Sequence, residues 1–459
     1  MAMHVIKSEN GTVTVKTACG IVRGKEEARC RVFLGIPFAR SERFAYATPV
    51  HAWDGELDAT RFGLCCPQNR AVHEHLEHPT RRFYKREFRE GQEFTYDEDC
   101  LNLNIFTPVA AKDADGCPVV VFIHGGGFDS GMNCEPPFDG SALAGRGIVT
   151  VCINYRVGVL GYLTHADIQR QYGRDGNFGL DDQLVGIRWV REHIADFGGD
   201  AENITLLGQS AGAISIQYLC LNHENEGLFR RAVMLSGGGC FPKFALPRRA
   251  EDTHAYWEQF IELAGCGSLD ELRALPLDRL FVTVETFRGL RKDNTYCTMP
   301  VVDGLLLPAP VDELIRDPLR LDYMIGYTNN DMYAPVMAFI GNRFGRHNGA
   351  YLYCFDIDAP GDDNAAFHSS DVRYIFETLR GSWRPYGARD YEASNQMASY
   401  LANFARTGDP NGAGLPLWKR AGKGPLTPVL RIAPAKTKMG HVNYLKLTHN
   451  ALTKGEPKA

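Results

Sequence analysis

The sequence lacks the features that mark membrane proteins and nucleic-acid-binding proteins. No stretch reaches the roughly 18 consecutive apolar residues of a transmembrane helix, and no basic block stands out in a chain of net charge −5. We therefore expect no membrane span and no nucleic-acid partner. Residues 1–24 lack the basic start and unbroken apolar run of a secretory signal. We expect a cytoplasmic protein, or a secreted one if a signal segment is removed ahead of this chain.

Sequence motifs for metal binding and for redox chemistry are also missing. The chain has 13 cysteines but no Cys-x-x-Cys pair, which argues against zinc-ribbon and thioredoxin-type chemistry. The number is odd, so at least one cysteine stays outside any intrachain disulfide, and we expect mostly reduced thiols. His73, His75 and His78 cluster in one charged stretch, yet neither H-E-x-x-H nor H-x-x-E-H is present. A solvated helix or loop is the simpler interpretation there, a metal-dependent hydrolase is the alternative, and we expect no metal and no cofactor.

Repeats and low-complexity linkers are absent, which favours one domain over residues 1–459. Short β-branched runs alternate with helical patterns, and this order predicts an α/β protein with a mostly parallel, twisted sheet and helices on both faces. Residues 67–97 break the rhythm and predict a charged surface excursion. The expected strands cover 118–125, 147–155, 203–208 and 231–237, and the expected helices cover 180–197 and 211–221.

The stretch "NITLLGQSAGAISIQYL" at 203–219 contains Ser210 in a G-x-S-x-G pattern. An apolar strand precedes the serine and a helical pattern follows it, which is the strand–turn–helix context this motif requires. A serine hydroxyl is a poor nucleophile unless a base takes its proton and a carboxylate orients that base. Ser210 is our candidate nucleophile; an ordinary serine among small residues is the alternative.

A second glycine-rich turn, "FIHGGGFDSG", follows the expected strand at 118–125. Glycines at such a place let the backbone approach a ligand and present its N–H groups. Taken alone, this turn is also compatible with a flexible loop. Beside a nucleophilic serine it favours a binding site for the oxyanion of an acyl-transfer reaction.

Several longer stretches resemble the type-B carboxylesterase family, whose members have the α/β-hydrolase fold. The resemblance implies helical and loop insertions around the active-site entrance, Ser210 as nucleophile, and an oxyanion hole built from the N–H groups of Gly126, Gly127 and Ala211. The stretches are "FLGIPFA" (33–39), "EDCLNLNIFTP" (98–108), "HGGGF" (124–128), "NYRVGVLGYL" (154–163), 175–213, "MPVVDGLLLP" (299–308) and "ANFARTGDPNG" (402–412).

The base and the acid should follow Ser210 in the order acid, then histidine. His368 lies in "AAFHSSDVRYIFETL", which resembles the histidine turn of the family; His347 is the rival, although it precedes the matching strand. Asp331 follows the strand-like "LDYMIGYT" where the family usually has Glu, and is our candidate acid. Asp303, in "VVDG", resembles a structural turn of the family.

Three departures from the family pattern affect what the resemblance implies. Gln209 stands where relatives commonly have Glu, which removes a negative charge beside the nucleophile and argues against a choline-ester preference. The segment 332–367 between acid and histidine is short, which predicts a wider, shallower entrance or one that another element completes. In that segment Tyr333, Met337, Phe339 and Phe344 could line a pocket or pack in the core.

The third departure concerns a disulfide. Cys66 and Cys100 match a family disulfide that would close the excursion between them, with Cys65 as an alternative partner. Closure of such a loop contributes roughly 3–4 kcal/mol in the chain-entropy model. Both the oxidised and the reduced state remain open for a chain without a signal segment.

The function expected from these residues is a serine carboxylesterase that acts on small-molecule esters through an acyl-enzyme. An inactive, cholinesterase-like binding protein is the alternative, although such relatives usually lack a triad member and none is missing here. The oligomeric state cannot be read from the sequence.

Overall fold

The computed structural model describes residues 4–9, 11–68, 79–109, 116–241, 246–291, 298–331, 334–421, 426–434 and 436–443. Within them a 14-stranded sheet runs in the order β1-β2-β3-β4-β8-β10-β9-β11-β12-β13-β14-β15-β16, with β7 beside β3; β5 and β6 form a separate pair. The strands are β1 (His4–Glu9), β2 (Thr12–Thr17), β3 (Gly20–Glu26), β4 (Cys30–Pro37), β5 (Ala39–Arg40), β6 (Thr48–Pro49), β7 (Glu56–Asp58), β8 (Asn102–Pro108), β9 (Cys117–Ile123), β10 (Val149–Ile153), β11 (Gly199–Gln209), β12 (Arg231–Leu235), β13 (Asp322–Thr328), β14 (Ala350–Phe355), β15 (Leu426–Ile432) and β16 (Lys438–Asn443).

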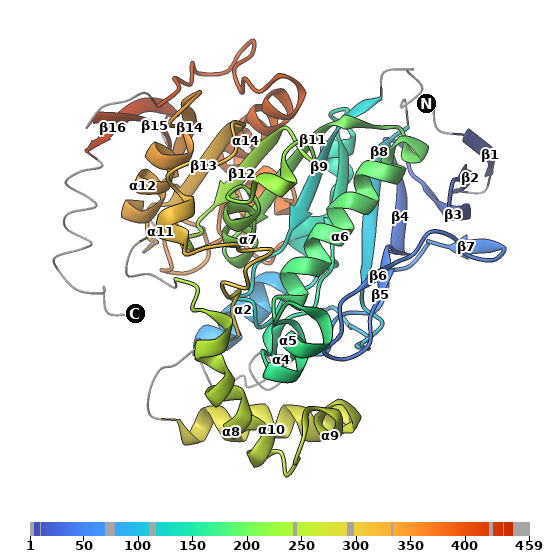
Figure 1. Ribbon diagram of the computed structural model, residues 1–459. Helices are drawn as coiled ribbons and strands as arrows, with labels where there is room; N and C mark the ends of the chain where they lie inside the picture. Colours follow the sequence, from blue (N-terminus) through green and yellow to red (C-terminus); the bar gives the residue numbers. More distant parts are fainter. Residues whose placement is uncertain are drawn as a thin grey trace.

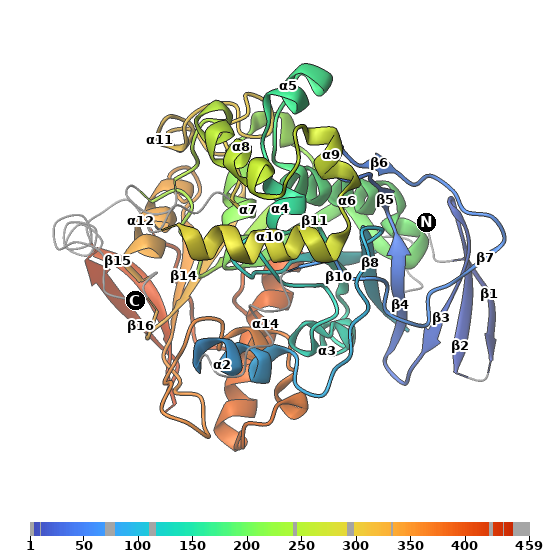
Figure 2. The ribbon, with the colours of Figure 1, turned by 90° about the horizontal axis from the view of Figure 1, so that it is seen from below.

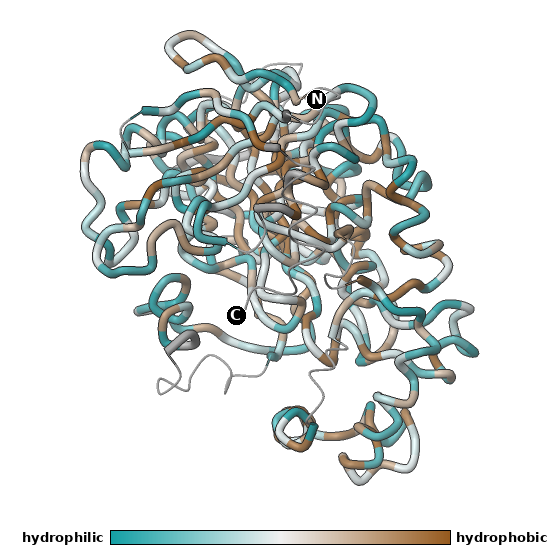
Figure 3. Tube along the Cα trace, turned by 90° about the vertical axis from the view of Figure 1, so that its left-hand side faces the viewer, coloured by the Kyte–Doolittle hydropathy of each residue, from teal (hydrophilic) through white to brown (hydrophobic). Residues whose placement is uncertain are grey.

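The centre of the sheet is parallel from β10 through β15, and the strands on either flank pair antiparallel except β7, which runs parallel to β3. The central strands are buried on both faces, as expected for parallel strands covered by helices. In β9, Val119 and Val121 pack into one hydrophobic core while Val120 and Phe122 pack into a second core. Figure 3 shows the hydrophobic segments gathered in the interior. The expected mostly parallel sheet is confirmed.

Helices cover both faces of this sheet (Figures 1 and 2). Helices α6 and α7 contribute to the first core, whereas α3, α13 and α14 contribute to the second. None of the described helices combines the length and the apolar composition that a membrane span requires. The α-helices are α2 (Pro79–Phe88), α3 (Ser141–Ala144), α4 (Gly158–Tyr162), α5 (Ala166–Tyr172), α6 (Phe178–His193), α7 (Ala211–Leu219), α8 (His254–Leu263), α9 (Leu269–Ala274), α10 (Leu277–Leu290), α11 (Val311–Leu314), α12 (Ala334–Phe344), α13 (Val372–Ile375) and α14 (Ala388–Thr407), and the 3-10 helices are η1 (Pro136–Phe138), η2 (Ile194–Phe197), η3 (His223–Asn225), η4 (Ala250–Thr253) and η5 (Leu379–Gly381).

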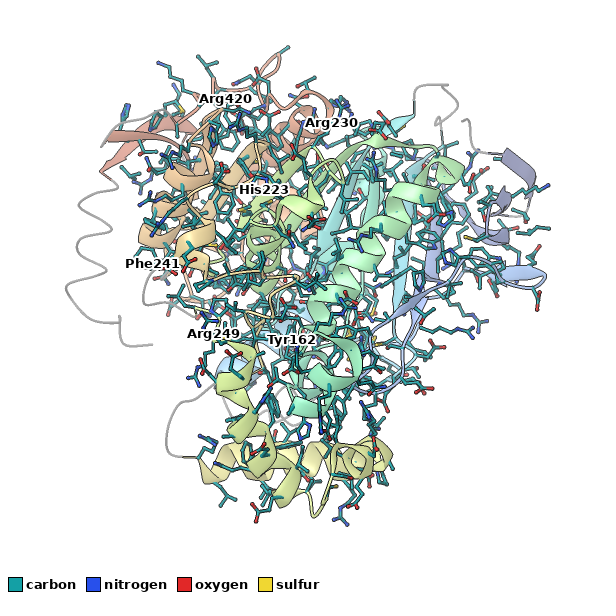
Figure 4. The ribbon with its side chains drawn as sticks, in the orientation of Figure 1. Tyr162, His223, Arg230, Phe241, Arg249 and Arg420 are labelled. Carbon is teal, nitrogen blue, oxygen red and sulfur yellow. The ribbon has the colours of Figure 1, made fainter. Side chains whose placement is uncertain are left out.

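The carboxyl ends of the parallel strands all face the same end of the molecule. In Figure 4, Arg230 lies just before β12 at the upper end of the view, and Phe241, which follows β12, lies nearer the lower end. Helices α8, α9 and α10, inserted between β12 and β13, lie below this end (Figure 1), and the view from below shows α2 displaced from them toward the side of the molecule that carries α14 (Figure 2). In open α/β sheets this end is where ligands bind.

Candidate active site

Ser210 sits alone in the sharp turn between β11 and α7. Its backbone has φ 55° and ψ −122°, a strained conformation for a residue other than glycine. The flanking glycines make the turn possible, because a Cβ on Gly208 would lie 2.5 Å from the backbone carbon of Gly212. The N–H of Ser210 donates to the carbonyl oxygen of Leu235 at 2.8 Å, which ties the turn to β12.

His368 and Asp331 form a hydrogen-bonded pair. Nδ1 of the imidazole lies 2.7 Å from Oδ2 of Asp331, whose side chain is 2% exposed, while that of His368 is 23% exposed. Asp331 lies in the turn that follows β13 and His368 lies in the loop after β14, so two adjacent parallel strands bring them together. A buried carboxylate at Nδ1 holds the imidazole in the tautomer whose Nε2 can accept a proton.

The two competing residues lie elsewhere. His347 faces Asp317, with Nε2 3.7 Å from Oδ1, and Asp317 is exposed. Asp303 accepts hydrogen bonds from the N–H groups of Leu305 and Leu307 and so stabilises its own turn. Neither residue lines the cavity that contains Ser210.

The glycine turn after β9 lies against the serine. Gly126 and Gly127 have φ 115° and 64°, and a Cβ on Gly126 would lie 2.0 Å from the carbonyl oxygen of Ser130. A Cβ on Gly125 would lie 2.9 Å from the Cβ of Ser210. The backbone around Gly125 and Gly126 therefore leaves no room for a side chain. Ala211, the third candidate, is the first residue of α7, where a helix N-terminus favours negative charge.

A cavity of about 320 Å³ brings these groups together. Both Ser210 and His368 line it, and so do the glycines of the turn after β9. The cavity is walled mainly by apolar surface. Its lining residues are Tyr84, Phe88, Arg89, Gly125, Gly126, Gly127, Asp129, Ser130, Gly131, Glu135, Phe138, Gln209, Ser210, His368 and Ser369.

Helix α2 supplies one wall of the cavity through Tyr84 and Phe88, which sequence reasoning did not identify. The described part of the 67–97 segment is therefore packed against the site. Glu87, on the same helix, is 3% exposed and accepts hydrogen bonds from Trp383 and Arg384, both at 2.9 Å. Burial, reinforced by the negative charge of Asp331, raises the pKa of Tyr84 to about 12. The aromatic spacing of "FYKREF" was the one available signal.

Two ion pairs sit in the cavity wall. Arg89 donates through Nε to Glu135 at 2.7 Å, and burial raises the pKa of Glu135 above its ordinary value although Arg89 opposes the shift. Asp129, just after the glycine turn, accepts two hydrogen bonds from Arg288 of α10, at 2.8 and 2.5 Å. Each charge that lines the cavity thus has an opposite charge beside it.

The described part of the short acid-to-histidine segment does not line the cavity. Met337, Phe339 and Phe344 of α12 are buried in the first core and are absent from the cavity lining, and Tyr333 lies outside the described residues. Core packing is therefore the role of the three described side chains. The wall that this segment could have supplied comes from α2 instead.

The disulfide between Cys66 and Cys100, which the sequence leaves open, is not formed in the structure. Cys66 and Cys100 are both buried free thiols. The thiol of Cys66 donates to the carbonyl oxygen of Pro67 and accepts from the N–H of Val157, so it is held as a thiol within the core. Cys65 pairs with neither of them but lies 3.5 Å, sulfur to sulfur, from Cys134.

No group of three or more potential metal ligands occurs among the described residues. His73, His75 and His78 fall outside them.

Known proteins resemble this chain along most of its length. The profile of the carboxylesterase family matches residues 11–343 and 332–449. The chain belongs to the carboxylesterase family. It is therefore a carboxylic-ester hydrolase by class. The para-nitrobenzyl esterase of Bacillus subtilis is 32% identical over 86% of this chain and 90% of its own length, and carboxylesterase 5A of Canis lupus familiaris is 30% identical over 88% and 83%.

Solved structures agree with this assignment. A carboxylesterase of Geobacillus stearothermophilus superimposes with a TM-score of 0.78 at 28% identity, covering 95% of this chain and 99% of that one. A thermophilic para-nitrobenzyl esterase superimposes with a TM-score of 0.81. The α/β-hydrolase fold is confirmed, and none of these relatives supports an inactive, cholinesterase-like binding protein.

Proposed function

We propose that this carboxylesterase hydrolyses esters with Ser210 as nucleophile, His368 as general base and acid, and Asp331 as the group that orients His368. One observation carries the proposal. The imidazole, held by Asp331 at 2.7 Å, opens on the same cavity as a serine in a strained turn beside a glycine loop. The serine, the imidazole that Asp331 orients and the glycine loop therefore meet at one cavity, as activation of a serine requires.

The reaction proceeds in two halves. Oγ of Ser210 attacks the ester carbonyl carbon while Nε2 of His368 takes the hydroxyl proton. The tetrahedral intermediate collapses as the C–O bond to the alcohol breaks, and His368 returns the proton to the departing alcohol. Water then attacks the acyl-serine, again with its proton going to His368, and the carboxylic acid leaves as Ser210 recovers its proton.

The negative charge on the carbonyl oxygen is held by N–H groups of Gly126, Gly127 and Ala211. The positive φ angles at the two glycines let their N–H groups face a ligand, and the N-terminus of α7 adds a favourable dipole. Donors fixed in advance by the fold cost no reorganisation during the reaction. Loss of one such donor typically lowers kcat by about 10²–10³.

The cavity favours a small, uncharged ester with an apolar acyl or alcohol group. Tyr84, Phe88 and Phe138 supply apolar walls, and the acidic groups of the lining are paired with arginines. Gln209 contributes no charge beside the serine. The described lining of the cavity therefore offers no unpaired carboxylate that could bind the cationic group of a choline ester.

The test compares the wild-type enzyme with Ser210→Ala, His368→Ala and, as control, His347→Ala. Hydrolysis of p-nitrophenyl acetate, butyrate and octanoate is measured with each. Ser210→Ala and His368→Ala should each lose about three or more orders of magnitude in kcat/KM, whereas His347→Ala should keep its rate. A folded wild-type protein that is inactive on all three esters would return the binding-protein alternative to consideration.

A further inference from the structure

Gln209 links the two loops that flank the serine. It is the last residue of β11 and only 4% exposed. Its amide nitrogen lies 3.1 Å from Nε2 of His368 and donates to Oγ of Ser369 at 2.7 Å. Its amide oxygen lies against the glycine turn, because a Cβ on Gly125 would come within 2.5 Å of it. This side chain thus spans from the oxyanion loop to the histidine loop.

The positions of the hydrogens determine which group donates in the contacts of Gln209 with His368 and Ser369. Asp331 accepts from Nδ1–H, so Nε2 of the neutral imidazole carries a lone pair and accepts. The amide nitrogen of Gln209 has two hydrogens, one for Nε2 and one for Oγ of Ser369. Oγ of Ser210 makes no hydrogen bond anywhere in the described part of the chain. The basic nitrogen is therefore engaged by the amide and not by the nucleophile.

We infer that Gln209 is a positioning residue that occupies Nε2 of His368 in the resting site, and that the Ser210 hydroxyl takes this place only once the amide withdraws. This inference rests on the proposed function. While the amide holds Nε2, the imidazole is kept in the tautomer that carries its hydrogen on Nδ1, with a donor at one end and Asp331 at the other. Among the described residues, the hydroxyl proton of Ser210 finds no acceptor until that contact is released.

Ser369 provides the place to which the amide withdraws. Its Oγ already accepts one amide hydrogen, so Gln209 keeps a partner when it leaves Nε2. Withdrawal is also required after proton transfer. Nε2 then carries a hydrogen, and the amide N–H can no longer donate to it. A glutamate at this place would have no N–H to donate, so this arrangement depends on glutamine.

The direct test is the ¹⁵N NMR signal of Nε2 of His368 in full-length protein labelled at its 14 histidines and held where the imidazole is neutral. The signal is assigned by its loss in His368→Gln. Ser210→Ala should leave it in place, because the serine is not its partner. Adding Gln209→Met should move it downfield by several ppm, because Nε2 loses its donor. A shift caused by Ser210→Ala alone, with none added by Gln209→Met, would overturn the inference.

A kinetic test examines the hydrogen bond that holds the Gln209 amide to Ser369 after it leaves Nε2. The neighbouring residue Ser370 supplies the control. Ser369→Ala removes the second acceptor and should lower kcat about tenfold, the worth of roughly one hydrogen bond, with KM unchanged. Ser370→Ala is the control, since the Ser370 hydroxyl is buried and has no hydrogen-bond partner among the residues that the structure describes. Equal kcat values for the two variants would contradict the withdrawal step. If Ser210→Ala keeps its esterase activity, the proposed function fails while the NMR result still decides the inference.

Discussion

Gly212 packs so closely on Ile123 that a Cβ on Gly212 would lie 2.0 Å from the carbonyl oxygen of Ile123. This contact presses the start of α7 onto the end of β9, and so sets Ser210 beside the glycine turn that follows β9. The nucleophile and the oxyanion loop are therefore held together by a contact between backbone atoms, and no side chain lies between them that could move to make room for a larger residue.

Gly212→Ala should therefore prevent correct folding or abolish activity. The added methyl group cannot be accommodated without moving β9 or α7, at a cost on the order of 3 kcal/mol or more. Urea unfolding and hydrolysis of p-nitrophenyl butyrate measure the two effects. Gly289→Ala is the control, because a Cβ there meets nothing within 4 Å, and its stability should stay within about 1 kcal/mol of wild type. Normal stability and activity of Gly212→Ala would refute the close approach.

Asp331→Asn should keep the fold and lose most of the activity. The amide is the same size, but its nitrogen can donate toward Nδ1 and so favours the wrong imidazole tautomer, an effect worth about 10⁴ in kcat in the serine-protease triad. Thermal unfolding and kcat are measured together. Asp317→Asn, beside His347, is the control and should match wild type in kcat. A loss of tenfold or less in Asp331→Asn would remove Asp331 from the triad.

Glu87→Ala should loosen the wall that α2 provides. The variant removes the acceptor for Trp383 and Arg384, and the loss of one partner of a buried ion pair costs about 3 kcal/mol or more. KM should rise because α2 carries Tyr84 and Phe88 into the cavity. Glu90→Ala breaks only the exposed pair with Arg86, at 3.8 Å, and should change stability by less than about 1 kcal/mol. Unchanged KM and stability in Glu87→Ala would show that α2 is held by other contacts.

Phe88→Ala should shift the acyl preference toward longer chains. The truncated side chain leaves room in a cavity of about 320 Å³, so kcat/KM for the octanoate relative to the acetate should rise about tenfold. Phe62→Ala serves as control, since Phe62 is 51% exposed and lies outside this cavity. The ratio of the two esters is the measured quantity. A ratio equal to that of wild type would mean that the acyl chain does not contact α2.

Asp371 should make stability depend on pH. Burial raises the pKa of Asp371 from 3.8 to about 6, although the hydrogen bond from Tyr353 opposes the shift. Between about pH 4 and pH 6 the folded protein keeps a proton that the unfolded chain releases, so stability falls across this window and stays lower above it. The full effect is about 3 kcal/mol.

Asp371→Asn should remove this contribution and keep an acceptor for Tyr353. The difference in the free energy of unfolding, variant minus wild type, should increase by about 3 kcal/mol from pH 4 to pH 7. Urea unfolding at a series of pH values measures it. A difference that is constant with pH would show that Asp371 ionises normally in the folded protein.

Local patterns were sufficient to predict the serine turn and the central strands. Alternating β-branched runs and glycines determine backbone geometry within a few residues, so Ser210 could be placed on its turn from its neighbours. The resemblance to the carboxylesterase family then indicated Asp331 and His368, which lie 37 residues apart and meet because β13 and β14 are adjacent.

The wall of the cavity was not predictable in this way. Arg89 and Glu135 are 46 residues apart, and Glu87 and Arg384 are 297 apart. Such pairs carry no local signal, since charged residues on a short helix are typical of a solvated surface. The contact of Gln209 with His368 likewise depends on how two loops meet across the end of the sheet, which composition at a single position does not determine.

The measurement that tests the central claim most directly is the reaction of the enzyme with a fluorophosphonate, followed by mass spectrometry of its peptides. The Ser210 oxygen forms a bond to phosphorus as fluoride leaves, and the adduct cannot be hydrolysed like an acyl-serine. The account predicts one adduct per chain, on Ser210, with loss of esterase activity in proportion and no adduct in Ser210→Ala. Full activity in a protein whose Ser210 is fully modified, or labelling at another serine with equal loss of activity, would contradict it.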